Sequence, residues 1–333
     1  MFRLLVTGGA GFIGSNFIRY IVNKYPDWKV TNIDKLTYAG NLENLTDLEN
    51  NNRYHFAKGD IADTEFINAL LSQGFDVVVN FAAESHVDRS ILDSYPFIET
   101  NIKGTQILLE GVKNYGINKF LQVSTDEVYG SIEEGSFSEE SPILPSSPYA
   151  ASKASAELLC LAYWTTYDLP VIITRCSNNY GPYQFPEKLI PLVITNALEG
   201  KEVPIYGDGL NIRDWIYVDD HCRALDLVIH HGKPGAIYNI GAKNEKTNLE
   251  TVKFILDNMG KPHSLMKFVN DRPGHDRRYS LDTSKICSEL GWKPIMSFED
   301  GIKYTLDWYM QNKLWWQRVK SGEYAEYYRK MYS

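Results

Sequence analysis

The chain has 333 residues, enough for one large α/β unit or for about two domains. Hydrophobic residues make up 44% and charged residues 23% of it, which is ordinary for a globular protein and excludes disordered and collagen-like classes. A formal net charge of −8 argues against nucleic acid as the main ligand. The apolar runs are too short for a membrane span and Met1 leads straight into a predicted strand, so we expect a cytoplasmic protein. The 4 scattered cysteines lack metal-ligand spacing, and we expect reduced thiols and no metal site.

The first half of the chain alternates short apolar runs with amphipathic stretches. Because each crossover helix must cover one face of a sheet, this alternation predicts parallel strands in a doubly wound, Rossmann-type α/β fold. Ligands of such sheets bind beyond the carboxyl ends of the strands, where we expect the functional residues. The predicted strands are residues 3–7, 29–34, 54–58, 76–81, 119–124 and 171–175, and the predicted helices are residues 12–24, 64–71, 97–114 and 149–167.

A glycine-rich turn follows the first predicted strand. Residues 8–14 read Gly-Gly-Ala-Gly-Phe-Ile-Gly and open the first helix, an arrangement that brings a pyrophosphate to a helix N-terminus. Asp34 ends the second strand, where a carboxylate accepts hydrogen bonds from the ribose hydroxyls of adenosine and repels a 2′-phosphate. NAD is therefore predicted rather than NADP, although Lys35 weakens the preference. The ends of the next two strands offer further cofactor contacts at residues 60–61 and 81–83.

The end of the fifth predicted strand carries groups suited to proton transfer. It reads Ser-Thr-Asp-Glu at residues 124–127, and Tyr149 and Lys153 follow on one face of a helix. A phenol has a pKa of about 10, which a nearby lysine and a nicotinamide cation would lower, so Tyr149 is a candidate base. Asp126 and Glu127 can act as an acid and a base when one of them is kept protonated.

The rhythm changes after about residue 178, where prolines and glycines divide the chain into short pieces. Helices are predicted at residues 248–258 and 284–290. We expect residues 1–178 to form the NAD-binding Rossmann domain, to which later segments return. Residues 179–333 are expected to form mainly a smaller, irregular α/β lobe for the substrate. Several aromatic side chains of the tail are expected to pack it onto the body: Trp308, Trp315, Trp316, Tyr327 and Tyr328.

The order of these motifs resembles the extended short-chain dehydrogenase/reductase family and, within it, the dTDP-glucose 4,6-dehydratase family. The broader resemblance is carried by TGGAGFIG, Asp34, STDEVYG and YAASK. The narrower one adds DKLTYAGN, AAESHVDRS, SSPYAASKA, NNYGPYQFPEKLIPL, GDGLNIRDWIYVDDH and DRPGHDRRY. It runs from Leu5 to about Trp292, and only the segment 130–147 differs, because it is compact compared with longer members of the family.

The resemblance implies two sets of binding residues. NAD would contact Gly8, Gly11, Phe12, Ile13, Gly14, Asp34, Lys35, Leu36, Thr37, Asp60, Ile61, Phe81, Ala82, Ala83, Ser85, Thr100, Tyr149, Lys153 and Asn179. A nucleotide-sugar substrate would contact Ser85, Thr125, Asn178, Lys188, Leu189, Pro204, Tyr206, Arg213, Asn248, Arg272 and His275. The charged run at residues 271–278 would otherwise indicate a solvated surface, and the resemblance favours diphosphate binding by its arginines. His86 and His221 are expected to be structural.

The implied reaction dehydrates dTDP-glucose to dTDP-4-keto-6-deoxyglucose for deoxysugar (rhamnose-type) biosynthesis. Tyr149, aided by Thr125 and Lys153, would deprotonate the hydroxyl on sugar carbon 4 while hydride passes to NAD⁺. Glu127 would then take the carbon 5 proton while Asp126 protonates the hydroxyl leaving carbon 6, to which hydride returns.

Three alternatives stay open. The first is a UDP-glucose 4,6-dehydratase, and the second is a sugar-nucleotide 4-epimerase, which needs no extra carboxyl pair. The third is an NAD-sensing regulatory protein, which would be expected to lack Tyr149 or Lys153. The resemblance also implies a homodimer built on helices 97–114 and 149–167 of each subunit, with no nucleic-acid or membrane partner.

Overall fold

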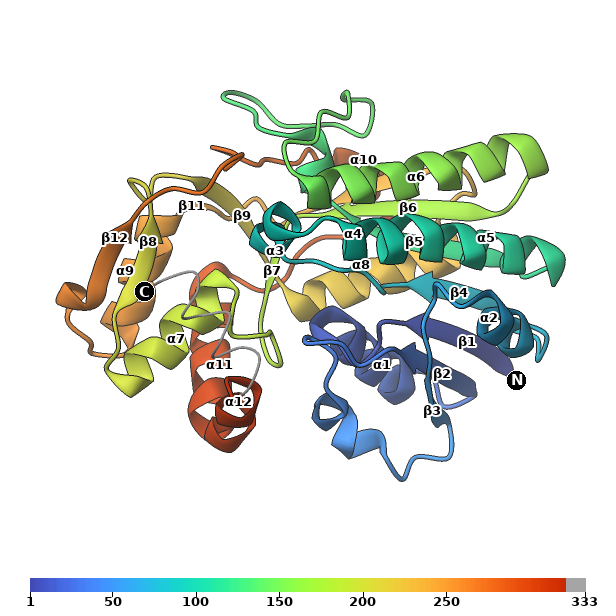
Figure 1. Ribbon diagram of the computed structural model, residues 1–333, viewed down its shortest axis with the longest axis horizontal. Helices are drawn as coiled ribbons and strands as arrows, with labels where there is room; N and C mark the ends of the chain where they lie inside the picture. Colours follow the sequence, from blue (N-terminus) through green and yellow to red (C-terminus); the bar gives the residue numbers. More distant parts are fainter. Residues whose placement is uncertain (322–333) are drawn as a thin grey trace.

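The computed structural model describes residues 1–321 and shows a larger lobe built on a parallel sheet beside a smaller lobe (Figure 1). The larger lobe has a 7-stranded sheet in the order β10-β6-β5-β4-β1-β2-β3. This order confirms the predicted doubly wound topology. From β1 the sheet is extended by β2 and β3 on one side and by β4, β5 and β6 on the other, so the strand order reverses between β1 and β4 while all strands stay parallel. The strands are β1 (Phe2–Thr7), β2 (Trp28–Asp34), β3 (Tyr54–Lys58), β4 (Val77–Asn80), β5 (Lys119–Thr125), β6 (Val171–Cys176) and β10 (Ile237–Ile240).

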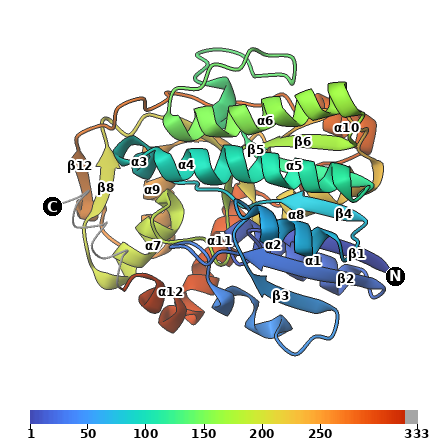
Figure 2. The same ribbon diagram turned by 45° about the vertical axis from the view of Figure 1, so that its right-hand side comes forward.

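Helices cover both faces of this sheet. Leu4 and Val6 of β1 pack on one face and Leu5 on the other, as the alternation of side chains along a strand requires. All three are buried, because a parallel sheet is covered on both sides. One face is covered by α1 (Phe12–Lys24), α8 (Val218–His231) and α10 (Ser284–Leu290), and the other by α2 (Thr64–Leu71), α5 (Thr105–Asn114) and α6 (Pro148–Tyr167), which lie side by side in Figure 2.

The helix expected at residues 97–114 is divided in the structure. It consists of α4 (Tyr95–Phe97), a π-helical turn η2 (Ile98–Gly104) and α5. In the π-helical turn, Asn101 donates to the backbone oxygen of Glu84 at 3.0 Å and to Ser152 Oγ at 2.8 Å. A further short helix, α3 (Val87–Leu92), lies in a segment for which we had predicted no element. The other predicted elements of the first half agree with the structure to within two residues.

The smaller lobe has its own core and two small sheets. The chain enters it at β7 (Asn178–Tyr180) and returns to the larger lobe through α8, β10 and α10. Helices α9 (Asn248–Asn258) and α10 have the predicted bounds, and Thr247 and Glu250 form a capping box at the start of α9. The remaining elements are α7 (Leu189–Glu199), β8 (Val203–Tyr206), β9 (Ile212–Tyr217), β11 (Glu245–Thr247), β12 (Met266–Val269), α11 (Phe298–Gln311) and α12 (Lys313–Val319).

The aromatic side chains of α11 and α12 attach this end of the chain to the body. Trp316 is fully buried, Trp308 packs against the same core, and Trp315 Nε1 donates to Asn44 Oδ1 at 3.0 Å. Asn44 belongs to η1 (Leu42–Leu48), in the first half of the chain. The predicted packing is therefore confirmed for these three residues, whereas Tyr327 and Tyr328 lie outside the described residues. Within residues 1–321, no helix combines the length and the apolar character needed to cross a membrane.

Candidate active site

The glycine-rich turn between β1 and α1 forms a cradle that side chains would fill. Gly8 has φ +67°, and a Cβ added to it would lie 2.6 Å from the backbone nitrogen of Ala82. A Cβ on Gly14 would lie 2.5 Å from the carbonyl oxygen of Gly8. Gly11 is the N-cap of α1 and puts no side chain at the helix N-terminus, where a phosphate group is favoured. The turn therefore fits the pyrophosphate of a dinucleotide.

Asp34, at the end of β2, is held in place by the backbone. Its carboxylate accepts the N–H of Ala10 at 3.0 Å and the N–H of Leu36 at 2.8 Å. Burial raises the pKa of Asp34, and these two hydrogen bonds lower it. Lys35 forms an ion pair with Asp60 at 2.6 Å, so the charge that weakened the prediction of NAD is balanced by a carboxylate. The arrangement suits an adenosine with free ribose hydroxyls better than one with a 2′-phosphate.

A cleft crosses the carboxyl ends of the central strands, and nearly all predicted cofactor contacts line it. Leu36 is the exception among the described residues: it has φ 58°, and its N–H is used by Asp34. The predicted residues that line this first cleft are Gly8, Gly11, Phe12, Ile13, Gly14, Asp34, Lys35, Thr37, Asp60, Ile61, Phe81, Ala82, Ala83, Ser85, Thr100, Tyr149, Lys153 and Asn179. All five predicted catalytic residues, including Thr125, Asp126 and Glu127, line the same cleft.

Tyr149 and Lys153 project from the first two turns of α6. The backbone N–H of Tyr149 donates to Ser90 Oγ at 3.1 Å, and its ring lies edge-on to Phe97 with centroids 6.3 Å apart. Lys153 Nζ donates to the carbonyl oxygen of Val123 on β5 at 2.7 Å. Both side chains are buried at the sheet end that faces the first cleft.

The pKa of Tyr149 differs from the expectation. Burial raises it well above 10 and the charge of Glu127 raises it further, whereas a hydrogen bond with Thr125 lowers it. Burial also lowers the pKa of Lys153 to about 8. The expected lowering relied on a lysine charge together with a nicotinamide cation. In the chain by itself the lysine is desolvated and donates to a carbonyl group, so burial dominates at Tyr149.

The carboxyl pair follows directly in the turn η3 (Asp126–Tyr129). Thr125 Oγ1 donates to Asp126 Oδ1 at 3.2 Å, and the Asp126 Oδ2 atom has no hydrogen-bond partner among the described residues. Burial and the neighbouring Glu127 charge raise the pKa of Asp126 well above its ordinary value. Burial raises the pKa of Glu127 as well, but the positive charges of Arg272 and Lys188 oppose the rise. The surroundings thus favour Asp126 as the proton donor and Glu127 as the base.

A second cleft adjoins the first and is lined by basic side chains of the smaller lobe. Lys188 Nζ donates to the carbonyl oxygen of Ser85 at 2.9 Å, which joins the two lobes. Arg213 Nη2 donates to the carbonyl oxygen of Asp276 at 3.0 Å. The predicted substrate contacts that line this cleft are Asn178, Lys188, Leu189, Pro204, Tyr206, Arg213, Asn248, Arg272 and His275, while Ser85 and Thr125 line the first cleft.

The arginines of residues 271–278 divide between the cleft and the surface. Arg272 lines the second cleft and forms an ion pair with Asp88 at 2.9 Å. Arg277 instead pairs with Asp208 at 2.8 Å, and Arg278 pairs with Glu245 at 2.8 Å. Only part of this charged run therefore faces the cleft, and Arg213 of β9 supplies a further guanidinium there.

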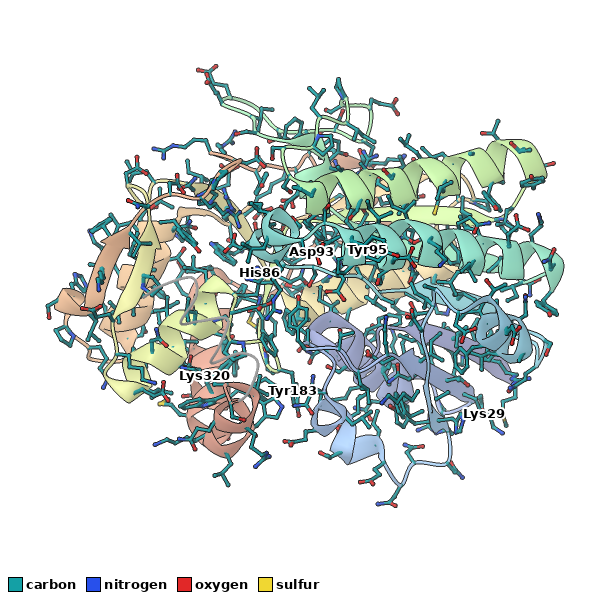
Figure 3. All side chains as sticks on the ribbon, viewed as in Figure 1. Lys29, His86, Asp93, Tyr95, Tyr183 and Lys320 are labelled. Atoms are coloured by element: carbon teal, nitrogen blue, oxygen red, sulfur yellow. The ribbon has the colours of Figure 1, made fainter. Side chains whose placement is uncertain are left out.

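Some residues of the site were missed or were assigned no role by sequence reasoning. His86, expected to be structural, is buried between the two lobes (Figure 3) and lines the second cleft. Glu187 lines both clefts, its Oε2 lies 3.9 Å from His86 Nε2, and burial raises its pKa to about 7. His86 lies in the motif AAESHVDRS and Glu187 in the motif NNYGPYQFPEKLIPL, so both residues belong to segments that carry the family resemblance. His221 is buried, and its Nδ1 lies 2.9 Å from Asn179 Oδ1, which agrees with a structural role.

Comparisons with known proteins place this geometry in a family. The model of the family described as GDP-mannose 4,6 dehydratase matches residues 5–305. A dTDP-glucose 4,6-dehydratase of Actinoplanes sp. is 52% identical over 319 residues, which cover 94% of this chain and 99% of the relative. The crystal structure of DesIV, a dTDP-glucose 4,6-dehydratase from Streptomyces venezuelae with NAD bound, matches with a TM-score of 0.94 at 52% identity, covering 96% of this chain and all of that one.

A UDP-glucuronic acid 4-epimerase from Bacillus cereus has the same fold at a greater distance, with a TM-score of 0.88 at 33% identity over 93% of this chain and 99% of that one. The higher identity to dehydratases agrees with the carboxyl pair at the end of β5. The chain therefore belongs to the sugar-nucleotide 4,6-dehydratase family that the matching model describes, and within it to the dTDP-glucose 4,6-dehydratases.

Proposed function

We propose that the protein catalyses the NAD-dependent dehydration of dTDP-glucose to dTDP-4-keto-6-deoxyglucose, a step of deoxysugar biosynthesis. The observation that carries the proposal is the carboxyl pair of η3, a buried Asp126 and a partly buried Glu127, which faces the same cleft as Tyr149 and Lys153. A redox reaction alone needs only the tyrosine and lysine. Removal of water across two carbons also needs an acid and a base, and the different surroundings of Asp126 and Glu127 supply both.

The residues of the chain then divide the proton transfers. NAD, when bound, accepts a hydride from the sugar and later returns it. Tyr149, with Thr125 beside it, takes the proton of the carbon 4 hydroxyl. Burial and the Glu127 charge raise the pKa of Asp126 well above its ordinary value, which favours the protonated form that can donate to the hydroxyl leaving carbon 6. Glu127, whose pKa rise is opposed by positive charges, takes the carbon 5 proton.

The second cleft suits a nucleoside diphosphate. Arg213 and Arg272 both line it, and guanidinium groups bind phosphate oxygens through paired hydrogen bonds. His275 and Tyr206 lie beside them, with ring centroids 6.1 Å apart. Glu127 and Asn178 line both clefts, so a sugar attached to a diphosphate in the second cleft can approach the carboxyl pair.

The test is to incubate the purified protein with dTDP-glucose, UDP-glucose and GDP-mannose in parallel. We expect the mass of water to be lost from dTDP-glucose and the alkaline absorbance of a 4-keto sugar to appear. Preferential loss of water from UDP-glucose would favour the UDP-glucose dehydratase. Formation of the 4-epimer without loss of mass would favour an epimerase, and binding of NAD without any conversion would favour a regulatory protein.

We also propose that the protein is a cytoplasmic homodimer. Apolar side chains on adjacent elements support the dimer: Tyr95 of α4, Ile98 of η2 and Leu158 of α6 are 66%, 50% and 57% exposed, and Tyr95 is labelled in Figure 3. A reducing compartment suits the free cysteines.

We further propose that residues 1–178 form an NAD-binding domain and that residues 179–333 form mainly a substrate-binding lobe. Strand β10 is the later segment that returns to the NAD-binding domain, because it pairs with β6 in the larger sheet.

A further inference from the structure

A buried ion pair joins the middle of α6 to the carboxyl end of β6, the strand that pairs with β5. Arg175 of β6 donates to Glu157 Oε2 of α6 through Nε at 2.9 Å and through Nη2 at 2.6 Å. The two side chains are only 2% and 0% exposed. Desolvation of two charges offsets much of their attraction, so a buried ion pair is weak evidence for a contribution to stability. Its geometry therefore calls for another explanation.

The third member of the arrangement is Tyr129, the last residue of the turn η3 that begins with the carboxyl pair. Its hydroxyl accepts from Arg175 Nη1 at 2.7 Å and donates to Asn239 Oδ1 of β10 at 2.8 Å. The Tyr129 ring is 1% exposed and stacks on Phe137, with centroids 4.8 Å apart. The far end of η3 is thus tied to two strands of the central sheet by one hydroxyl group.

The same ion pair also faces the lysine of the redox pair. Glu157 lies one helical turn after Lys153 on α6. Its charge raises the pKa of Lys153, which burial lowers. The second carboxylate oxygen of Glu157, Oε1, has no hydrogen-bond partner among the described residues. The carboxylate of Glu157 belongs to the same helix as Tyr149 and Lys153. Through Arg175 and Tyr129 it is also linked by hydrogen bonds to the turn that carries Asp126 and Glu127.

We propose that Arg175, Glu157 and Tyr129 form a positioning network that holds the carboxyl pair of η3 in register with the Tyr149–Lys153 face of α6. Among the described residues that line the two clefts, Arg175, Glu157 and Tyr129 do not occur. Each of them would therefore affect the reaction through other residues. This inference rests on the proposed function, because it explains how one hydrogen-bonded network positions the residues for the oxidation and the residues for the loss of water.

The network predicts a split between the two half-reactions. Removing the Tyr129 hydroxyl releases the far end of η3 from β6 and β10 but leaves the stacked ring in place. A displacement of about 1 Å of a catalytic group can cost on the order of 10²-fold in rate. The displaced groups would be Asp126 and Glu127, which act on carbons 5 and 6. Tyr149 is held by α6, by Ser90 and by a hydrogen bond with Thr125, which lies at the opposite end of η3 from Tyr129, so oxidation at carbon 4 should continue.

The experiment compares Tyr129→Phe with wild type in single-turnover mixing with dTDP-glucose. Four quantities are measured: the rate at which reduced nicotinamide absorbance appears, the rate at which the carbon 5 proton exchanges with deuterated water, the rate of product formation, and the thermal unfolding midpoint. We expect exchange and product formation to fall at least tenfold, while reduced nicotinamide still forms within twofold of the wild-type rate. Tyr238→Phe is the matched control, because Tyr238 is a fully buried tyrosine of β10 that bonds Glu289 at 3.2 Å and lines neither cleft. It should lower stability and change neither rate.

Arg175→Lys gives a second and independent test. A lysine keeps the ion pair with Glu157 but lacks the planar fork that reaches Glu157 and Tyr129 together. We expect the same split between the two rates. Equal falls in both rates, or unchanged rates, in either variant would overturn the positioning network. If the wild-type protein itself removes no water from dTDP-glucose, the proposed function fails instead, so the two failures are distinguishable.

Discussion

Replacing Glu187 with glutamine should change how the stability of the protein depends on pH. Glu187 lies between the two clefts, and burial raises its pKa from the ordinary 4.5 to about 7. A carboxyl group with a higher pKa in the folded than in the unfolded chain binds its proton more tightly when folded, so the fold loses stability as pH rises between the two values. At about 1.4 kcal/mol per pKa unit, the difference between 4.5 and about 7 corresponds to roughly 3 kcal/mol. The wild type should therefore lose roughly 3 kcal/mol relative to Glu187→Gln between about pH 4 and about pH 8.

The assay is urea unfolding followed by tryptophan fluorescence at several pH values, with the NAD concentration held constant because ligand binding shifts apparent stability. Only the change of the unfolding free energy with pH is predicted. Glu187 also lies 3.4 Å from Arg89 Nε, and losing this ion pair in Glu187→Gln adds an offset to the unfolding free energy that does not carry the prediction. Glu250→Gln is the control. The hydrogen bonds from the Thr247 backbone and side chain lower the pKa of Glu250, so that comparison should have the opposite slope. A difference between wild type and Glu187→Gln that stays constant within about 1 kcal/mol over this pH range would refute the reasoning.

Four further predictions concern the site and the assembly. Asp126→Asn and Glu127→Gln should each lower turnover by about 10²–10⁴-fold while reduced nicotinamide still forms on mixing with substrate, and normal turnover of both variants would contradict the dehydratase assignment. By contrast, Tyr149→Phe should slow the appearance of reduced nicotinamide itself. Asp34→Ala should narrow the preference for NAD over NADP in equilibrium binding, and equal affinity of the unmodified protein for both cofactors would refute the role of this carboxylate. Leu158→Asp should convert the dimer into a monomer in light scattering at micromolar concentration, whereas a wild-type monomer would refute the proposed assembly.

Much of the fold could be predicted because its signals are local. The glycine turn, the apolar strands and the pairing of Tyr149 with Lys153 each depend on residues a few positions apart. The features that were missed depend on partners far away in sequence. Asn101 of the π-helical turn bonds Ser152, 51 residues later, and Arg277 finds Asp208 at a separation of 69 residues.

The electrostatics of the site could be predicted only in part for the same reason. The residue types indicated proton transfer, and the carboxyl pair lies where the strand end placed it. The direction of the Tyr149 pKa depends on how completely the side chain is buried and on the Glu127 charge, which periodicity does not specify. The raised pKa of Glu187 likewise arises from packing between two lobes that come from different parts of the chain.

The hydrogen bond between Trp315 and Asn44 has a consequence for how the protein is made. It joins positions 271 residues apart, and Arg318 of α12 adds an ion pair with Glu43 at 2.5 Å. At about 5–20 residues per second, a ribosome needs roughly 15 to 50 s to add that many residues. During this interval η1 waits for its partner, and β6 is an open sheet edge until β10 emerges. The edge of β6 is therefore exposed to aggregation and to chaperones until β10 has been made, and η1 is without its α12 contact until Trp315 has emerged.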